Sequence, residues 1–146
     1  MSTLNGQVIG QAHFATRALL DRAVAPLGVD FGQVLALNAL TAGPVARTPL
    51  VRRLANARKV DESAVHEVID HLVDAGLAQL DDTTEAQVSL TDAGHATQAR
   101  VAEAVAGITA RLYGDIPPAE ADVAGRVLTL VTERANDELA GEAAQK

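Results

Sequence analysis

The sequence predicts a mainly α-helical chain with one small β-hairpin, and three features of residues 47–90 carry this prediction. Apolar residues recur at helical spacing between positions 61 and 77, on one face formed by Val65, Val68, Ile69, Leu72 and Val73. A shorter helical stretch, 49–57, ends about four residues upstream, so the two helices must meet at a sharp angle. The runs 77–80 and 87–90 alternate on either side of the polar segment DDTTEA, as the strands of a hairpin do. Helix, turn, helix and hairpin is the element order of a winged helix-turn-helix.

Two further helices are expected before this core. Residues 4–26 form one long amphipathic helix, which a proline and a glycine end. Asp30 then caps a second helix, 31–40, which is apolar on more than one face and is therefore expected to be buried. Within the core, the side chain of Asp61 or Glu62 is expected to cap the second helix of the helix-turn-helix.

Two helices are also expected after the hairpin. Thr91 is suited to cap a helix that runs to about Tyr113, and a break at 114–118 precedes a last helix that extends to about Leu139. The winged core needs little cover, so the apolar stripes of the first helix and the last two helices require a partner. They pack either on one another or, as we expect, on those of a second copy. The expected regions are a helical dimerisation region, 1–28 plus 92–146, and a winged helix-turn-helix region, 29–91, in one structural domain per protomer.

Composition limits what the chain can do. Its 146 residues suffice for one domain with a buried core, and the net charge of −7 argues against general binding to nucleic acid or to an anionic membrane. The absence of cysteine excludes disulfides, thiolate catalysis and cysteine-based metal centres. There is no basic segment followed by an apolar core at the start, and no apolar run approaches the length of a membrane span. We therefore expect a soluble, cytoplasmic protein.

Basic and acidic residues are separated along the chain. Residues 31–60 contain five basic residues and no acidic one, whereas residues 60–99 contain nine acidic residues and no Lys or Arg. The five basic residues are Arg47, Arg52, Arg53, Arg58 and Lys59. They fall on the first helix of the helix-turn-helix and on its turn, where this motif crosses the phosphate backbone of DNA. They are either phosphate contacts or a solvated face that forms ion pairs with the acidic neighbouring helix.

The same region resembles the core of the multiple antibiotic resistance regulator (MarR) family. The similarity is most specific in Ser63-Ala64-Val65 at the start of the second helix, in Leu72 and Ala75-Gly76-Leu77 at its end, and in the run SLTDAG at 89–94. The resemblance implies a homodimeric transcriptional regulator that binds pseudo-palindromic double-stranded DNA. The second helix would enter the major groove, and the hairpin, called the wing, would touch the flanking backbone or the minor groove.

The resemblance also implies which residues face the bases. They are Ser63, Ala64, His66, Glu67 and His71. This surface is unusually acidic for the family, because Glu67 stands where Arg is frequent and the arginine of the family's wing is missing. The two histidines would restore positive charge at mildly acidic pH. The alternative is that these are ordinary exposed polar residues.

A ligand site is a further implication, because the family usually binds a small molecule between its dimerisation helices and its winged core. His13 and Arg17 lie four residues apart on one face of the first helix. Together with Tyr113 they would bind a small anionic or aromatic ligand. Alternatively, His13 and Arg17 pair with acidic residues of the last helices.

No other chemistry is indicated. No two of the four histidines have the i, i+3 or i+4 spacing of a helical metal site, and the few serines belong to no nucleophile motif. We therefore expect no enzyme activity, no metal and no cofactor. Two hypotheses remain for the function. The first is a MarR-type regulator that binds DNA and responds to a ligand. The second is a winged-helix dimer that has lost DNA binding and acts through a protein partner by its acidic helix and wing.

Overall fold

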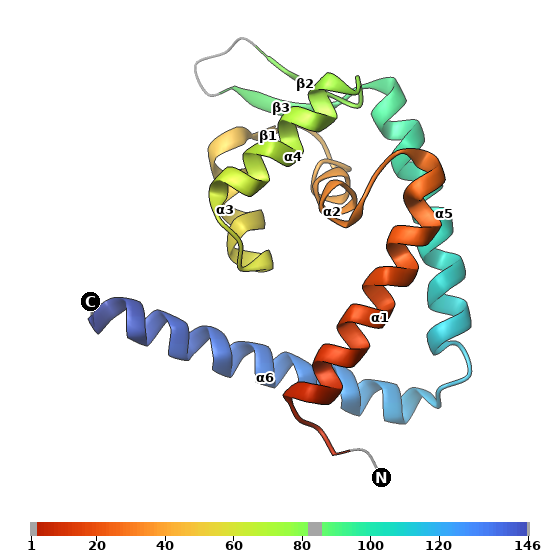
Figure 1. Ribbon diagram of the computed structural model, residues 1–146, viewed down its shortest axis with the longest axis vertical. Helices are drawn as coiled ribbons and strands as arrows, with labels where there is room; N and C mark the ends of the chain where they lie inside the picture. The colour runs from red at the N-terminus through yellow and green to blue at the C-terminus, as the bar shows by residue number, and fades with distance from the viewer. Residues whose placement is uncertain (1–2, 82–85, 146) are drawn as a thin grey trace. The chain divides into compact units, whose positions relative to one another are not determined.

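The computed structural model describes residues 3–81 and 86–145, so the predicted turn of the hairpin at 82–85 lies outside the described residues. The chain divides into two compact units, residues 1–106 and 107–146. The described ranges form six α-helices and a small antiparallel sheet (Figure 1). The predicted fold class, mainly α with a small β element in a winged helix-turn-helix, is confirmed.

The first unit begins with a long helix, α1 (Gly6–Val24), which is followed by one 3-10 turn, η1 (Ala25–Leu27). Helix α2 (Phe31–Ala39) comes next and is largely buried, as its sequence predicts. Asp30 caps α2 as predicted: its carboxylate accepts the N–H of Gln33 at 3.0 Å, and the Gln33 side chain accepts the N–H of Asp30 at 2.9 Å. This reciprocal pair fixes the residue at which α2 begins.

The helix-turn-helix consists of α3 (Arg47–Arg58) and α4 (Glu62–Asp74), close to their predicted positions. The apolar stripe of α4 faces inward, and its fully buried members are Val65, Ile69 and Leu72. The prediction that the side chain of Asp61 or Glu62 caps this helix is wrong, because Asp61 is the N-cap residue and makes no side-chain capping hydrogen bond, and Glu62 is already the first residue of the helix. The backbone carbonyl of Asp61 accepts the N–H of Ala64 at 3.1 Å, so the first turn is closed by the main chain alone.

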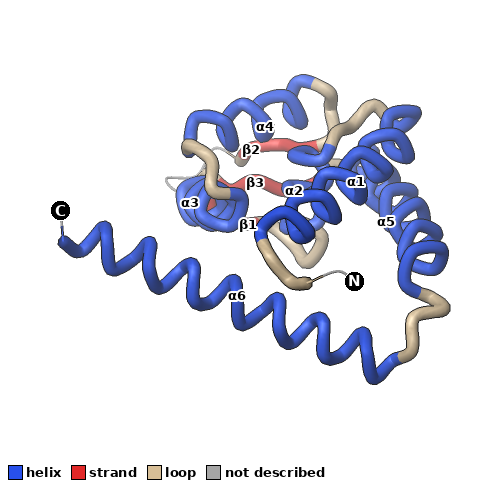
Figure 2. The backbone as a smooth tube through the Cα atoms, turned by 60° about the horizontal axis from the view of Figure 1, so that its bottom comes forward, coloured by secondary structure: helices blue, strands red, loops and turns tan. Residues whose placement is uncertain are grey.

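The wing is part of a three-stranded sheet. The strands are β1 (Val45–Ala46), β2 (Ala78–Leu80) and β3 (Gln87–Leu90), in the antiparallel order β1-β3-β2 (Figure 2). The predicted hairpin is β2 and β3, whereas β1 is not predicted by the sequence. A two-residue strand is too short to show alternation, and β1 exists because Val45 pairs with Val88 of β3.

One hydrophobic core joins these elements. It contains residues of α2, α3, α4 and the sheet, together with Val101 of α5 (Asp92–Tyr113). Thr91 caps α5 as predicted, since its hydroxyl accepts the N–H of Gly94 at 3.0 Å. This core makes the helix-turn-helix and the wing one rigid structure on which surface residues are held.

The second unit contains the end of α5 and the helix α6 (Pro118–Gln145). Most side chains of α6 are exposed, including large apolar ones such as Val123 at 50% and Leu139 at 52%. Within the described residues, no helix combines the length and the apolar character needed to span a bilayer.

Candidate nucleic-acid interface and ligand site

The turn between α3 and α4 is made by Lys59, whose φ of 57° lies in the left-handed region. This conformation reverses the chain after a helix, and glycine usually adopts it because a Cβ is unfavourable there. The N–H of Val60 donates to the carbonyl of Ala55 at 3.1 Å and closes the turn. The end of α3 is thereby held beside the start of α4.

A shallow surface depression of about 420 Å³ lies at this turn. It is lined mainly by polar and charged side chains of both helices: Arg52, Asn56, Lys59, Asp61 and Glu62, with Ala55 and Val60. Arg52, Arg53 and Lys59 are exposed, and none of them forms an ion pair with another described residue. These three cations are therefore available to an outside anion such as a phosphate.

Arg47, in contrast, binds two residues of α4. Its Nε donates a hydrogen bond to Nδ1 of His66 at 3.1 Å, and its Nη2 donates to Oδ1 of Asp70 at 2.9 Å. Its backbone N–H also donates to the carbonyl of Ala86, next to β3, at 3.0 Å. The Arg47 side chain is only 20% exposed. The basic residues are predicted either to contact phosphate or to form ion pairs with the neighbouring helix, and Arg47 forms such an ion pair.

This ion pair sets the charge of the middle of α4. The guanidinium of Arg47, hydrogen-bonded to Asp70, lowers the pKa of that carboxyl from its usual value of 3.8, while partial burial opposes the change. The positive charge of Arg47 lowers this pKa further, and so do His66 and His71 when they are protonated. Asp70 is therefore ionised at neutral pH, and its charge cancels that of Arg47.

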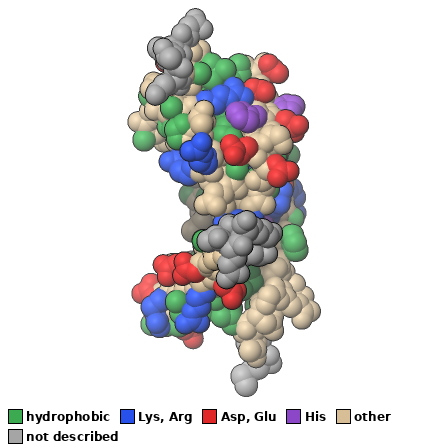
Figure 3. Space-filling model, turned by 90° about the vertical axis from the view of Figure 1, so that its left-hand side faces the viewer, with side chains coloured by type: hydrophobic (Ala, Val, Ile, Leu, Met, Phe, Trp, Pro, Cys, Tyr) green, Lys and Arg blue, Asp and Glu red, His purple; other side chains and the backbone are tan. Residues whose placement is uncertain are grey.

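The residues predicted to face bases lie at the surface of α4 to different degrees. Ser63, Glu67 and His71 are exposed, whereas Ala64 and His66 are half-buried. Figure 3 shows histidine side chains at the surface with acidic and basic side chains around them. The described residues bring together no group of three His, Cys, Asp or Glu side chains that could hold a metal ion. The face of α4 thus offers hydrogen-bonding groups and net negative charge.

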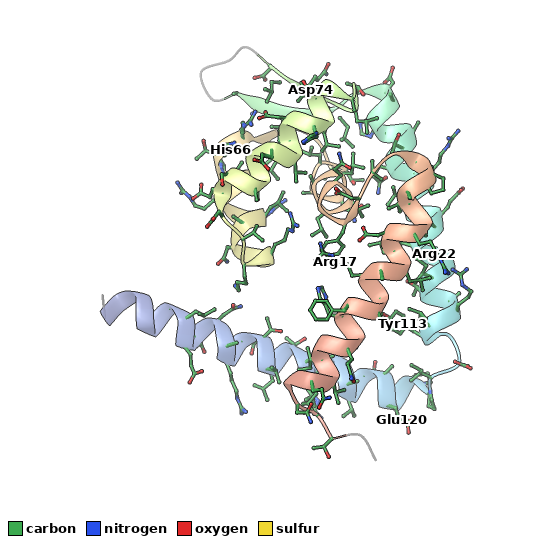
Figure 4. All side chains as sticks on the ribbon, viewed as in Figure 1. Arg17, Arg22, His66, Asp74, Tyr113 and Glu120 are labelled. Carbon is green, nitrogen blue, oxygen red and sulfur yellow. The ribbon has the colours of Figure 1, made fainter. Side chains whose placement is uncertain are left out.

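A second cluster surrounds the ring of Phe31 at the start of α2. The guanidinium carbon of Arg17 in α1 lies 4.8 Å from the ring centroid, and that of Arg58 in α3 lies 5.9 Å from it. The ring of His13 lies 6.2 Å away and meets the Phe31 ring edge-on at 79°. Figure 4 labels Arg17, whose side chain extends from α1. Two guanidinium groups and an aromatic ring suit an anionic group attached to an aromatic one.

The predicted ligand residues are only partly brought together. His13 and Arg17 meet at Phe31, whereas Tyr113 belongs to the second compact unit, where it is 51% exposed. Phe31 is not among the residues predicted for this cluster, and Arg58 is predicted only as one of the basic residues that contact phosphate or form ion pairs with the neighbouring helix. No spacing along the chain indicates that α1, α2 and α3 meet at one ring, so no sequence signal for the two residues exists.

Solved structures of other proteins are similar to this chain, whereas sequence families are not. No protein-family model matches the chain, and no curated protein matches it. A MarR family transcriptional regulator from Streptomyces coelicolor is 22% identical, with a TM-score of 0.76 over 90% of this chain and 92% of that one. Another from Silicibacter pomeroyi is 22% identical, with a TM-score of 0.74 over 89% and 88%. A MarR family protein from Mycobacterium tuberculosis, solved in complex with p-aminosalicylic acid, is 21% identical, with a TM-score of 0.67 over 89% and 99%.

These similarities show that the chain has the winged helix-turn-helix fold of MarR family transcriptional regulators. The resemblance predicted from residues 63–94 is confirmed at the level of the fold. The similar structures named above are described as MarR family proteins, two of them as transcriptional regulators and none as an enzyme.

Proposed function

We propose that the protein is a homodimeric, cytoplasmic transcriptional regulator of the MarR type that binds pseudo-palindromic double-stranded DNA. The observation that carries this proposal is that Arg52 and Lys59 line the depression at the start of α4, and that neither they nor the exposed Arg53 form an ion pair with another described residue. In a helix-turn-helix, cations at this point contact phosphates and orient the second helix in the major groove. The base-facing residues of α4 would then be Ser63, Ala64, His66, Glu67 and His71.

The proposal includes a second copy of the chain. Helix α6 exposes apolar side chains along its length, among them Val123, Leu130 and Leu139. An amphipathic helix without a covered face is expected to find a partner. A second copy joined through residues 1–28 and 92–146 would cover it, and would give two helix-turn-helix regions, 29–91, for two half-sites.

We also propose a ligand site at Phe31, formed by His13, Arg17 and Arg58. Two guanidinium groups lie near one ring without an ion pair among the described residues. Similar structures of a Mycobacterium tuberculosis MarR family protein contain p-aminosalicylic acid or salicylic acid, which are aromatic carboxylates. A ligand of this class would bind both cations and contact the helix-turn-helix through Arg58.

A specific observation favours a second function. Residues 60–99 carry no Lys or Arg, and Arg47, which contacts α4, is paired with Asp70. A surface with this charge repels phosphates. The alternative is therefore a winged-helix dimer without DNA binding that docks on a basic protein partner through α4 and the wing.

One titration separates the two functions. The protein is mixed with the DNA upstream of its own gene at two salt concentrations, and the retarded complex is quantified. For the regulator, affinity falls steeply with salt. In each of the single variants Arg52→Ala and Arg53→Ala, the slope of log K against log salt becomes less steep by about 2. The reason is that one phosphate contact is lost from each of the two protomers. Arg22→Ala, an exposed substitution on α1, serves as the control with an unchanged slope. Absence of any complex at low salt supports the alternative function.

A further inference from the structure

The hydrogen bond between Arg47 and His66 fixes the protonation state of the imidazole. Nδ1 of His66 accepts the Nε–H of Arg47 at 3.1 Å. An acceptor nitrogen has no proton, so this arrangement requires neutral His66 with its proton on Nε2. A proton on Nδ1 turns the acceptor into a donor that faces another donor, and it adds a second positive charge at the same distance. Protonated His66 is therefore incompatible with the observed contact.

When His66 is protonated, it and Arg47 are two cations that compete for the carboxylate of Asp70. It lies four residues after His66 on α4, the spacing at which side chains of one helix meet, and it binds Nη2 of Arg47 at 2.9 Å. Once protonated, His66 can pair with the Asp70 carboxylate itself. The group Arg47, His66 and Asp70 changes from a net charge of 0 to +1, and Arg47 loses one of its two side-chain partners.

Among the described residues, few other charged groups lie on the elements packed against α4. The main elements packed against α4 are α2, α3 and β2. Helix α2 and strand β2 contain no charged residue, and among the described residues α3 contributes only Arg47 to a hydrogen bond with α4. On α4 itself the remaining titratable side chains are Glu62, Glu67, His71 and Asp74, all of them exposed. Of these, His71 acts on Asp70.

We propose that protonation of His66 breaks its hydrogen bond with Arg47 and frees the Arg47 guanidinium for phosphate, so that the helix-turn-helix binds DNA more tightly at mildly acidic pH. This inference rests on the proposed DNA-binding function. It assigns Arg47 a second state, in which its charge is available to DNA and is no longer cancelled by Asp70. The gain in DNA affinity arises on the acidic surface of α4, where one freed cation reduces the net negative charge that faces the DNA.

The experiment measures affinity for the upstream DNA at about pH 7.5 and about pH 5.5, on either side of the range in which imidazoles titrate. One or two added phosphate contacts per dimer raise affinity roughly 10- to 60-fold at about 0.1 M salt. In His66→Gln the side-chain oxygen still accepts from Arg47 but does not titrate, so the gain is lost. His71→Gln, which removes an exposed histidine of the same helix, is the matched control and keeps most of the gain.

A second readout needs no DNA. In the ¹⁵N spectrum of the full chain, the Nε–H of Arg47 is expected to lose its protection from solvent at the pH at which His66 titrates. An Arg47 signal that ignores the titration of His66 overturns the inference, and so does an acid gain that persists in His66→Gln. If Arg47 follows His66 but neither pH gives a DNA complex, the proposed function fails, and with it the effect on DNA.

Discussion

The backbone of Gly94, in the first turn of α5, lies directly against the carbonyl oxygen of Leu77 at the start of the wing. A Cβ built on Gly94 would overlap this oxygen. Thr91 strengthens the junction, because its hydroxyl donates to the carbonyl of Gly76 at 2.6 Å and accepts the N–H of Gly94 at 3.0 Å. The end of α4, the wing and the start of α5 are therefore held by a contact that only glycine permits.

Gly94→Ala is expected to destabilise the protein by about 2–3 kcal/mol, because the methyl group forces a buried helix start away from backbone atoms that cannot move aside. Gly10→Ala is the matched control in the interior of α1, where an added Cβ meets nothing closer than Phe14 at 3.9 Å. It is expected to stabilise by roughly 0.5–1 kcal/mol through helix propensity. Urea denaturation of both variants measures the two effects, and equal effects would contradict the close contact.

Lys59 is the only residue other than glycine with a positive φ in the described part of the chain. Lys59→Gly is expected to stabilise by about 0.5–1 kcal/mol, because the left-handed strain it removes exceeds the added freedom of the unfolded chain. Arg53→Gly, in the regular part of α3, is expected to cost about 1 kcal/mol. Thermal unfolding without DNA compares the two, and destabilisation by Lys59→Gly would show that the turn is not strained.

Asp70 gives the stability a pH dependence with a definite sign. Its pKa is lowered in the folded state, chiefly by the hydrogen bond from Arg47. The ionised carboxylate therefore contributes stability that is present above the unfolded pKa of about 4 and is lost as pH falls through the lowered folded value. We expect the stability difference between His66→Gln and His66→Gln/Asp70→Asn to be constant above about pH 5 and to shrink below about pH 4. If this stability difference instead grew as the pH fell, the ionised Asp70 carboxylate would not be the stabilising form, and the prediction would be wrong.

The negative charge of α4 is expected to limit DNA affinity. Glu67→Arg replaces an exposed acid by a cation on the face of α4 and adds contact with phosphate or a guanine edge. We expect affinity for the upstream DNA to rise roughly 10-fold or more at about 0.1 M salt. Glu103→Arg makes the same charge change at an exposed position of α5 and should have a much smaller effect. Equal gains from both would indicate a general charge effect.

The cluster at Phe31 is expected to bind an aromatic carboxylate. Calorimetry with salicylic acid as the probe should detect binding, and Arg17→Gln should weaken it roughly 10-fold by removing a charge-assisted contact. Arg22→Gln, also on α1 but with no contact to Phe31 among the interactions of the described residues, is the control. Unchanged affinity in Arg17→Gln would mean that any bound salicylic acid lies elsewhere.

The sequence alone determined the elements whose signals are local. The apolar spacing of α4, the cap at Asp30 and the alternation of β2 and β3 depend on residues a few positions apart, and each predicted element is present. The run from Ser63 to Gly94 also indicated the fold. The charge distribution along 31–99 was readable too, because composition needs no coordinates.

Only the tertiary structure decided which charges are free. Arg47 and His66 are 19 residues apart, and Arg17, Phe31 and Arg58 come from three helices. The sequence presents Arg47 and Arg52 as equivalent members of one basic cluster. The fold pairs Arg47 with Asp70 and leaves Arg52 exposed. The physical reason is that an ion pair depends on a distance in space, which the sharp turn at Lys59 sets and which no periodicity along the chain encodes.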